Sequence, residues 1–118
     1  MQAMHPLLTA ALADAAPLVA ARGWSAPAPA TLAAAQRLLG LLAPYPRPPA
    51  VQVEPVGTIS FEWEAADQGW LTLTVDDAGR LAHSAVIAGD EFTQSEDFGD
   101  ALPDWAAELL ARLMRAGH

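Results

Sequence analysis

Apolar and polar residues alternate without interruption between Gly57 and Glu64. Alternation with a period of two places the two kinds of side chain on opposite faces of a β-strand. The apolar side carries Ile59, Phe61 and Trp63, and the polar side carries Ser60, Glu62 and Glu64. The pattern therefore predicts an antiparallel strand with one face in the core and the other face in solvent.

Four further segments show the same period, at 51–53, 70–75, 80–87 and 91–95. They are separated by residues that favour turns at 55–57, 76–79 and 89–90, and by a loop at 65–69. Strands that follow one another through short connections predict an antiparallel meander of about five strands.

The first segment of the chain, residues 6–22, has its apolar residues at helical spacing. Its apolar positions recur at intervals of four, three and four residues, at Leu8, Leu12, Ala15 and Val19. Pro17 interrupts this segment, because proline removes a backbone donor and crowds the preceding turn. We expect either a kink at this proline or two short helices that meet near Asp14.

A second helix is predicted from Pro27 or Pro29, with Thr31 as another candidate cap, to about Leu42. Its apolar stripe consists of Leu32, Ala35, Leu39 and Leu42, and Arg37 is expected to point away from that stripe. The proline-rich segment 44–49 cannot be helical, and we interpret it as an extended connector to the sheet.

A third helix is predicted over 102–115, where Trp105, Leu109 and Leu113 recur every four residues. Pro103 suits the first helical position, and Glu108 and Arg112 have the spacing of an i, i+4 ion pair. Helices and strands do not alternate along the chain, so the prediction is one α+β domain over residues 1–118. We expect the two N-terminal helices and the C-terminal helix to pack on one face of the sheet.

Composition narrows the range of partners. The formal net charge is −8, from 14 acidic residues against six arginines and no lysine. Such an acidic surface repels phosphate backbones, so we expect no nucleic-acid partner. The absence of cysteine excludes disulfides and thiolate chemistry. No apolar run is long enough to cross a bilayer, and we expect a cytoplasmic protein with no membrane partner.

Charged residues make up only 17% of the chain, while hydrophobic residues make up 53%. Fewer charges than usual are available to cover the surface. We therefore expect some apolar surface to be shared with another subunit, which makes a homodimer the default prediction.

The histidines form no metal-binding or catalytic pattern. His5, His83 and His118 lack the spacing of a metal site. His83 and Ser84 are neighbours in a strand and point to opposite faces, so they cannot act as a nucleophile and its base. Dispersed glycines provide no phosphate-binding loop.

The carboxylates allow two functional interpretations, a glycosidase pair and a calcium site. A structural explanation is preferred for each. Glu62 and Glu64 share a strand face, about 7 Å apart, which is a separation found in inverting glycosidases. A solvated sheet face explains the pair more simply. An acidic run comprises Asp90, Glu91, Glu96, Asp97, Asp100 and Asp104. It lacks the spacing of a calcium loop, and a polar edge strand explains it. The sequence predicts no catalytic residue, no cofactor and no metal.

The middle of the chain carries a recognisable series of elements: Gly23-Trp24, an Ala/Leu helix over 34–42, prolines at 46–49, and the strand from Gly57 to Trp63. In these elements the chain resembles a family of small bacterial proteins that end the same series in Gly, an apolar–polar alternation, Glu and Trp. The resemblance spans about a third of the chain. It implies the α+β fold and no catalytic residue, because no chemistry is assigned to that family.

Three of the four tryptophans are expected in or at the end of the core, and the fourth on the surface. Trp63 and Trp105 are expected to face one another between the sheet and the last helix, and Trp24 to close one end of the core. Trp70 differs, because alternation places it on the polar side of its strand. An exposed tryptophan on a sheet is typical of a binding hot spot.

We therefore predict a non-enzymatic module that binds another protein or a copy of itself. The expected interface consists of Trp70, Thr72, Thr74 and Glu62. The alternative is a small enzyme or small-molecule binder with a pocket between helices and sheet, for which His83, Glu62 or Glu64 would have to turn inward against the alternation. A mimic of nucleic acid would need regular rows of carboxylates, and most of them are scattered.

Overall fold

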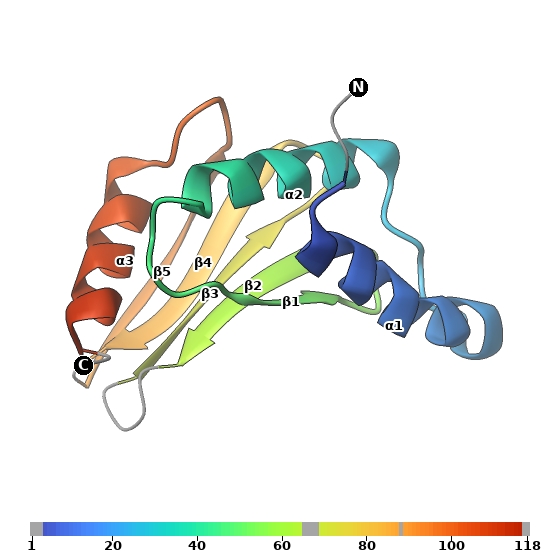
Figure 1. The fold of residues 1–118 in the computed structure, drawn as a ribbon, viewed down its shortest axis with the longest axis horizontal. Coiled ribbons are helices and arrows are strands. Elements are labelled where there is room, and N and C mark those ends of the chain that lie inside the picture. Colours follow the sequence, from blue (N-terminus) through green and yellow to red (C-terminus); the bar gives the residue numbers. More distant parts are fainter. Residues whose placement is uncertain (1–3, 65–68, 88, 117–118) are drawn as a thin grey trace.

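The computed structural model describes residues 4–64, 69–87 and 89–116, with only the backbone for 115–116. The elements are α1 (Pro6–Arg22), α2 (Pro29–Leu42), β1 (Ala50–Val53), β2 (Ile59–Glu64), β3 (Gly69–Val75), β4 (Arg80–Ile87), β5 (Asp90–Asp97) and α3 (Asp104–Ala116) (Figure 1). The strands form one antiparallel sheet in the order β1-β2-β3-β4-β5, which confirms the predicted meander. The predicted loop at 65–69, apart from Gly69, and His118 lie outside the described residues.

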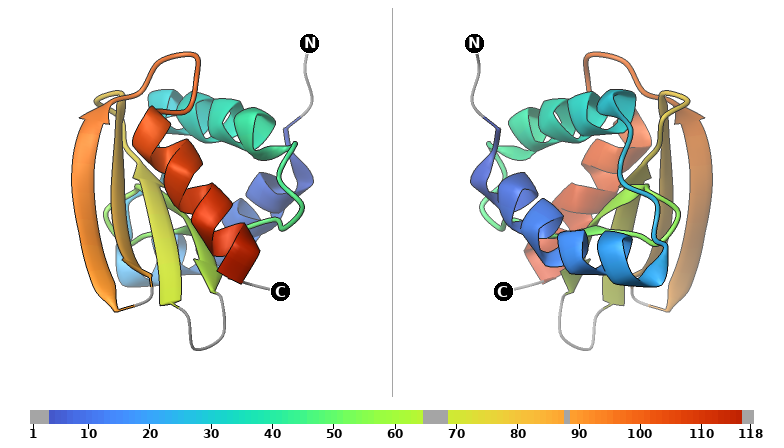
Figure 2. Two further views of the ribbon diagram at one scale, coloured as in Figure 1. Left: turned by 90° about the vertical axis from the view of Figure 1, so that its left-hand side faces the viewer. Right: turned by 90° about the vertical axis from the view of Figure 1, so that its right-hand side faces the viewer.

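The helices form a layer on one face of the sheet, as expected for this α+β fold (Figure 2). α1 contacts β1, α2 contacts β2 and β3, and α3 contacts β3. The core lies between the two layers, where Phe61 and Leu73 of the sheet are fully buried with Leu8, Leu38 and Leu110 of the helices. The apolar side of β2 thus faces the helices, as its alternation predicted.

α1 is a single helix, although Pro17 lies inside it. The side chain of His5 caps its first turn, because Nδ1 accepts a hydrogen bond from the backbone N–H of Leu7 at 3.1 Å. Gly23 ends the helix at a φ of 69°, a conformation that favours glycine. Local caps therefore define both ends of α1.

The bounds of α2 agree with the prediction, whereas α3 begins later than the predicted 102. α2 begins at Pro29 with Ala28, not Thr31, as its cap, and there is no side-chain capping hydrogen bond. Pro103 precedes α3 rather than opening it, and its carbonyl accepts from the backbone N–H groups of Ala106 and Ala107. Arg37 lies over the ring of Phe98, 4.7 Å from its centroid.

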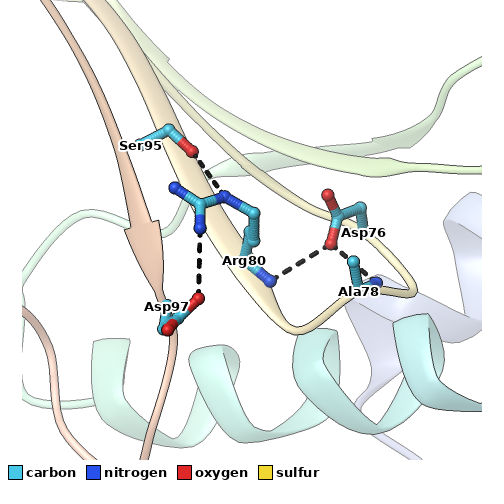
Figure 3. A network of polar contacts seen from close by, with 5 residues as sticks. All are labelled: Asp76, Ala78, Arg80, Ser95 and Asp97. Carbon is cyan, nitrogen blue, oxygen red and sulfur yellow. Dashed lines mark hydrogen bonds and ion pairs between the residues drawn. The ribbon is translucent and has the colours of Figure 1, made fainter.

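The turn between β3 and β4 uses the residues that the sequence marked. Asp76 Oδ1 accepts hydrogen bonds from the backbone N–H groups of Ala78 at 2.9 Å and Arg80 at 3.1 Å (Figure 3). An aspartate that bonds to the backbone two residues later stabilises a turn locally. The turn places Arg80 at the start of β4, where its side chain reaches β5.

Ser60 corrects the expectation that every polar side chain of β2 lies in solvent. It points away from the helices but is only 2% exposed. Its hydroxyl donates to Glu54 Oε1 at 2.6 Å, and Gln52 Nε2 donates to the same oxygen at 3.0 Å. The carboxylate of Glu54 therefore satisfies the Ser60 hydroxyl, and Gln52 bonds to the same carboxylate oxygen.

Gly69 allows a direct test of the β3–β4 pairing. A Cβ at this position would lie 1.7 Å from the carbonyl oxygen of Val86, and the φ of 141° also disfavours other residues. We expect Gly69→Ala to lower the free energy of unfolding by at least about 2 kcal/mol in urea denaturation. Gly40→Ala is the matched control, because α2 has open space there, and it should raise stability by up to about 1 kcal/mol. Equal shifts in the two variants would contradict the close approach at Gly69.

Candidate functional site

The sheet face that points away from the helices is called the outer face below. The strand register sets Glu64, Trp70, Val86 and Glu91 side by side in one row from β2 to β5. Two apolar side chains therefore stand in the middle of the row with a carboxylate at each end. Trp70 is 37% exposed, although it belongs to the central strand.

All the residues of the predicted interface belong to the outer face. Glu62 pairs with Thr72 across β2 and β3, and Thr74 pairs with Ser60. Glu62, Thr72 and Thr74 are half-buried. Because diagonal neighbours on a sheet are about 7–8 Å apart, Trp70 and Glu62 can contact the same partner. The structure thus brings the predicted residues together on one surface.

Negative charge surrounds Trp70 on the outer face, where Glu62, Glu64 and Glu91 project from β2 and β5. Arg80 is farther along β4 and is already engaged, since Nη1 lies 3.1 Å from Asp97 Oδ1 and Nε donates to Ser95 at 3.1 Å (Figure 3). The apolar centre of the outer face therefore has an acidic border.

The Glu62–Glu64 pair lines a hollow of about 400 Å³ together with Arg47 and Trp63. Trp63 Nε1 donates to the carbonyl of Arg47 at 3.0 Å, and the Arg47 guanidinium donates to the carbonyl of Glu64. The Glu64 side chain is exposed. A glycosidase acid requires an apolar enclosure, which an exposed carboxylate does not have.

The acidic run forms no cluster that could hold a metal ion. Asp97 pairs with Arg80, and Glu96 accepts a hydrogen bond from the indole of Trp105. Across the described parts of the chain, no group of three or more His, Asp or Glu residues has the arrangement of a metal site. The carboxylates are thus distributed over the β5 edge and the start of α3.

His83 points toward the helices, which corrects the expectation that an inward direction would break the alternation. It shares its strand face with Leu81, Ala85 and Ile87, all of them buried, and it is 5% exposed. The inward direction therefore follows the alternation of β4. This is the polar side chain that a pocket between helices and sheet would require.

Trp105 packs against His83, with ring centroids 4.1 Å apart and an angle of 30° between the planes. Its indole N–H donates to the carboxylate of Glu96. The ring against which Trp105 stacks is thus that of His83 on β4. Trp63 is buried on β2, where it bonds to the connector.

His83 has no hydrogen bond within the described chain, and its Nδ1 is buried without a partner. Buried polar atoms in proteins usually have one, and an unsatisfied atom is costly. Burial also lowers the pKa of His83 from the ordinary value of 6.5, so the imidazole is neutral at pH 7. A neutral imidazole carries one N–H donor and one acceptor nitrogen.

The residues around His83 were not predicted as a site. Gln94 is its register partner on β5, and Arg112 lies over Phe92, two residues earlier in that strand. The available signal was the spacing of Trp105, Leu109 and Arg112, which places them along one side of α3. The missing information was the position of α3 on the sheet, which no local pattern contains.

None of the described helices is both long enough and apolar enough to cross a membrane. No family model matches the chain, and no curated protein or solved structure matches it significantly. The outer face and the surroundings of His83 must therefore be interpreted from their own chemistry.

The lowered pKa of His83 predicts how stability depends on pH. Between that pKa and 6.5 the unfolded chain binds more protons than the folded protein. The contribution of His83 is thus complete above about pH 6.5 and is lost as the pH falls toward the folded pKa. We expect the urea midpoint to fall between about pH 7.5 and 5.5, and to fall less in His83→Asn. An NMR titration that places the pKa of His83 at or above 6.5 would contradict this.

Proposed function

We propose that this protein binds another protein through its outer face, and that the partner presents a basic surface. The observation that carries the proposal is the row Glu64, Trp70, Val86 and Glu91, with its exposed tryptophan between carboxylates. An aromatic anchor within a polar rim is the usual arrangement of an interface hot spot.

The charge of the outer face favours a basic partner over a second copy of the chain. A symmetric dimer through this face would bring the carboxylates of Glu62, Glu64 and Glu91 near those of the other copy. Like charges across an interface are destabilising, whereas lysine and arginine on a partner would pair with them. An arginine could also lie over the Trp70 ring.

The edges of the sheet support binding through the face. The β5 edge carries Asp90, Glu91, Glu96 and Asp97, and charged edges disfavour the addition of another strand. At the opposite edge, α1 packs against β1. The outer face is therefore the broad surface of the sheet that remains for a partner.

A synthetic β-strand peptide with alternating arginine and leucine provides a defined probe, and an alternating glutamate–leucine peptide is its control. We expect calorimetry to show saturable binding of the basic peptide and none of the acidic peptide. The basic peptide should also change the NMR chemical shifts of β2, β3 and β4. Affinity should fall as salt is raised from about 50 to 300 mM, because exposed charges are screened. Shift changes confined to the helices would contradict the proposal.

Trp70→Thr should weaken binding of the basic peptide by about 30-fold, the effect of losing a hot-spot side chain. Val56→Thr is the matched control, because Val56 is 75% exposed but lies in the β1–β2 turn, and it should bind as the unmodified protein does. Both variants should retain the far-UV circular dichroism spectrum. Light scattering that finds a dimer dissociated by Trp70→Thr would identify a second copy as the occupant instead.

A further inference from the structure

A cavity of about 310 Å³ lies between α3 and the inner side of β4 and β5. His83, Phe92 and Gln94 line it from the sheet, and Trp105, Leu109 and Arg112 line it from the helix. It is on the opposite side of the sheet from Trp70. Its volume is at the lower end of the range for small-molecule sites.

Contacts between α3 and β5 bound the cavity at both ends. At one end the Trp105 indole donates to Glu96. At the other end the Arg112 guanidinium carbon lies 5.3 Å from the centroid of the Phe92 ring. Leu109, which is buried, lies between Trp105 and Arg112 on the same side of the helix. The cavity is therefore a defined space about two helical turns long.

Most polar side chains that line the cavity are exposed to solvent, but His83 and Arg112 are more buried, and neither has a hydrogen-bond or ion-pair partner within the described chain. His83 is buried and Nδ1 is unpartnered. Arg112 is half-buried and contacts Phe92, and it does not form the ion pair with Glu108 that the i, i+4 spacing predicted. The cavity, which is open to solvent on one side, thus combines a neutral imidazole with a guanidinium that forms no ion pair within the described chain.

We propose that this cavity binds a small monocarboxylate whose apolar body is a single ring or a short aliphatic chain. The planar guanidinium of Arg112 presents paired N–H donors that match a carboxylate. The neutral imidazole of His83 supplies one further donor, and Trp105, Phe92 and Leu109 provide apolar walls. The carboxylate of Glu108 is exposed at the rim, where it disfavours a ligand with a second negative charge.

Three probes of similar shape and different charge test whether the site prefers a carboxylate to a neutral or a cationic group. They are phenylacetate, phenylacetamide and phenethylamine. We expect phenylacetate to bind with a Kd of about 1 mM or lower, measured by NMR chemical-shift titration. Phenylacetamide should bind at least about tenfold more weakly, because it lacks the charge that strengthens bonds to Arg112. Equal binding of all three, stronger binding of the amine, or no saturable binding of phenylacetate would overturn the proposal.

Arg112→Gln should reduce the affinity for phenylacetate by at least about tenfold. Its amide NMR spectrum should remain that of a folded protein. Arg22→Gln is the matched control, because Arg22 is exposed at the end of α1, and it should leave the affinity unchanged. An affinity unchanged in Arg112→Gln would overturn the assignment. Trp70→Thr should bind phenylacetate normally, which separates this site from the outer face.

The imidazole of His83 provides a second readout that does not depend on a variant. Phenylacetate should shift its ring ¹⁵N resonances, since the carboxylate accepts its N–H, whereas phenethylamine should leave them unchanged. Ring nitrogens that do not respond at saturation with phenylacetate would exclude His83 from the site.

Discussion

Burial of one face of the sheet beneath three helices is the constraint on which the other features depend. Each large apolar side chain moved from water into this core contributes about 1.5–3 kcal/mol. A shift of one residue in any strand would turn its apolar set outward, so burial also determines the register. Phe61 and Leu73 are register partners and both are fully buried, which links β2 and β3 through the core as well as through the backbone.

The same register determines what the outer face presents. Once the apolar side chains face the helices, Trp70 and Val86 become neighbours on the opposite side. Neither belongs to the core, and carboxylates of β2 and β5 border this small apolar area. Arg80 pairs with Asp97 away from it, an exposed ion pair that contributes little to stability. The carboxylates of the acidic border are thus not paired with Arg80, and the proposed basic partner would contact them.

α3 adds a polar feature to the inner side. A histidine occupies a core position of β4, where its neighbours Leu81 and Ala85 are buried apolar residues. Stacking on Trp105 satisfies the flat surface of the ring but none of its nitrogens. Such a local conflict with good core packing is expected more often at functional positions than elsewhere. The cavity beside it and the uncommitted Arg112 are consistent with that expectation.

Local periodicity was sufficient to predict the five-stranded meander, the three helices and the inward direction of Phe61 and Trp63. The turn residues Asp76 and Gly79 were also predictable, because their role depends on near neighbours in the chain. The alternation of Leu81, His83 and Ala85 already contained the inward direction of His83, but a polar residue in that pattern was interpreted as an exception.

Tertiary structure alone decided which elements meet. The burial of Ser60 depends on Glu54, across a turn, and the stack of Trp105 on His83 depends on where α3 crosses the sheet. Arg112 meets Phe92 instead of Glu108 for the same reason. Such contacts join segments whose relative positions result from packing of the whole core, and no local sequence pattern encodes that packing.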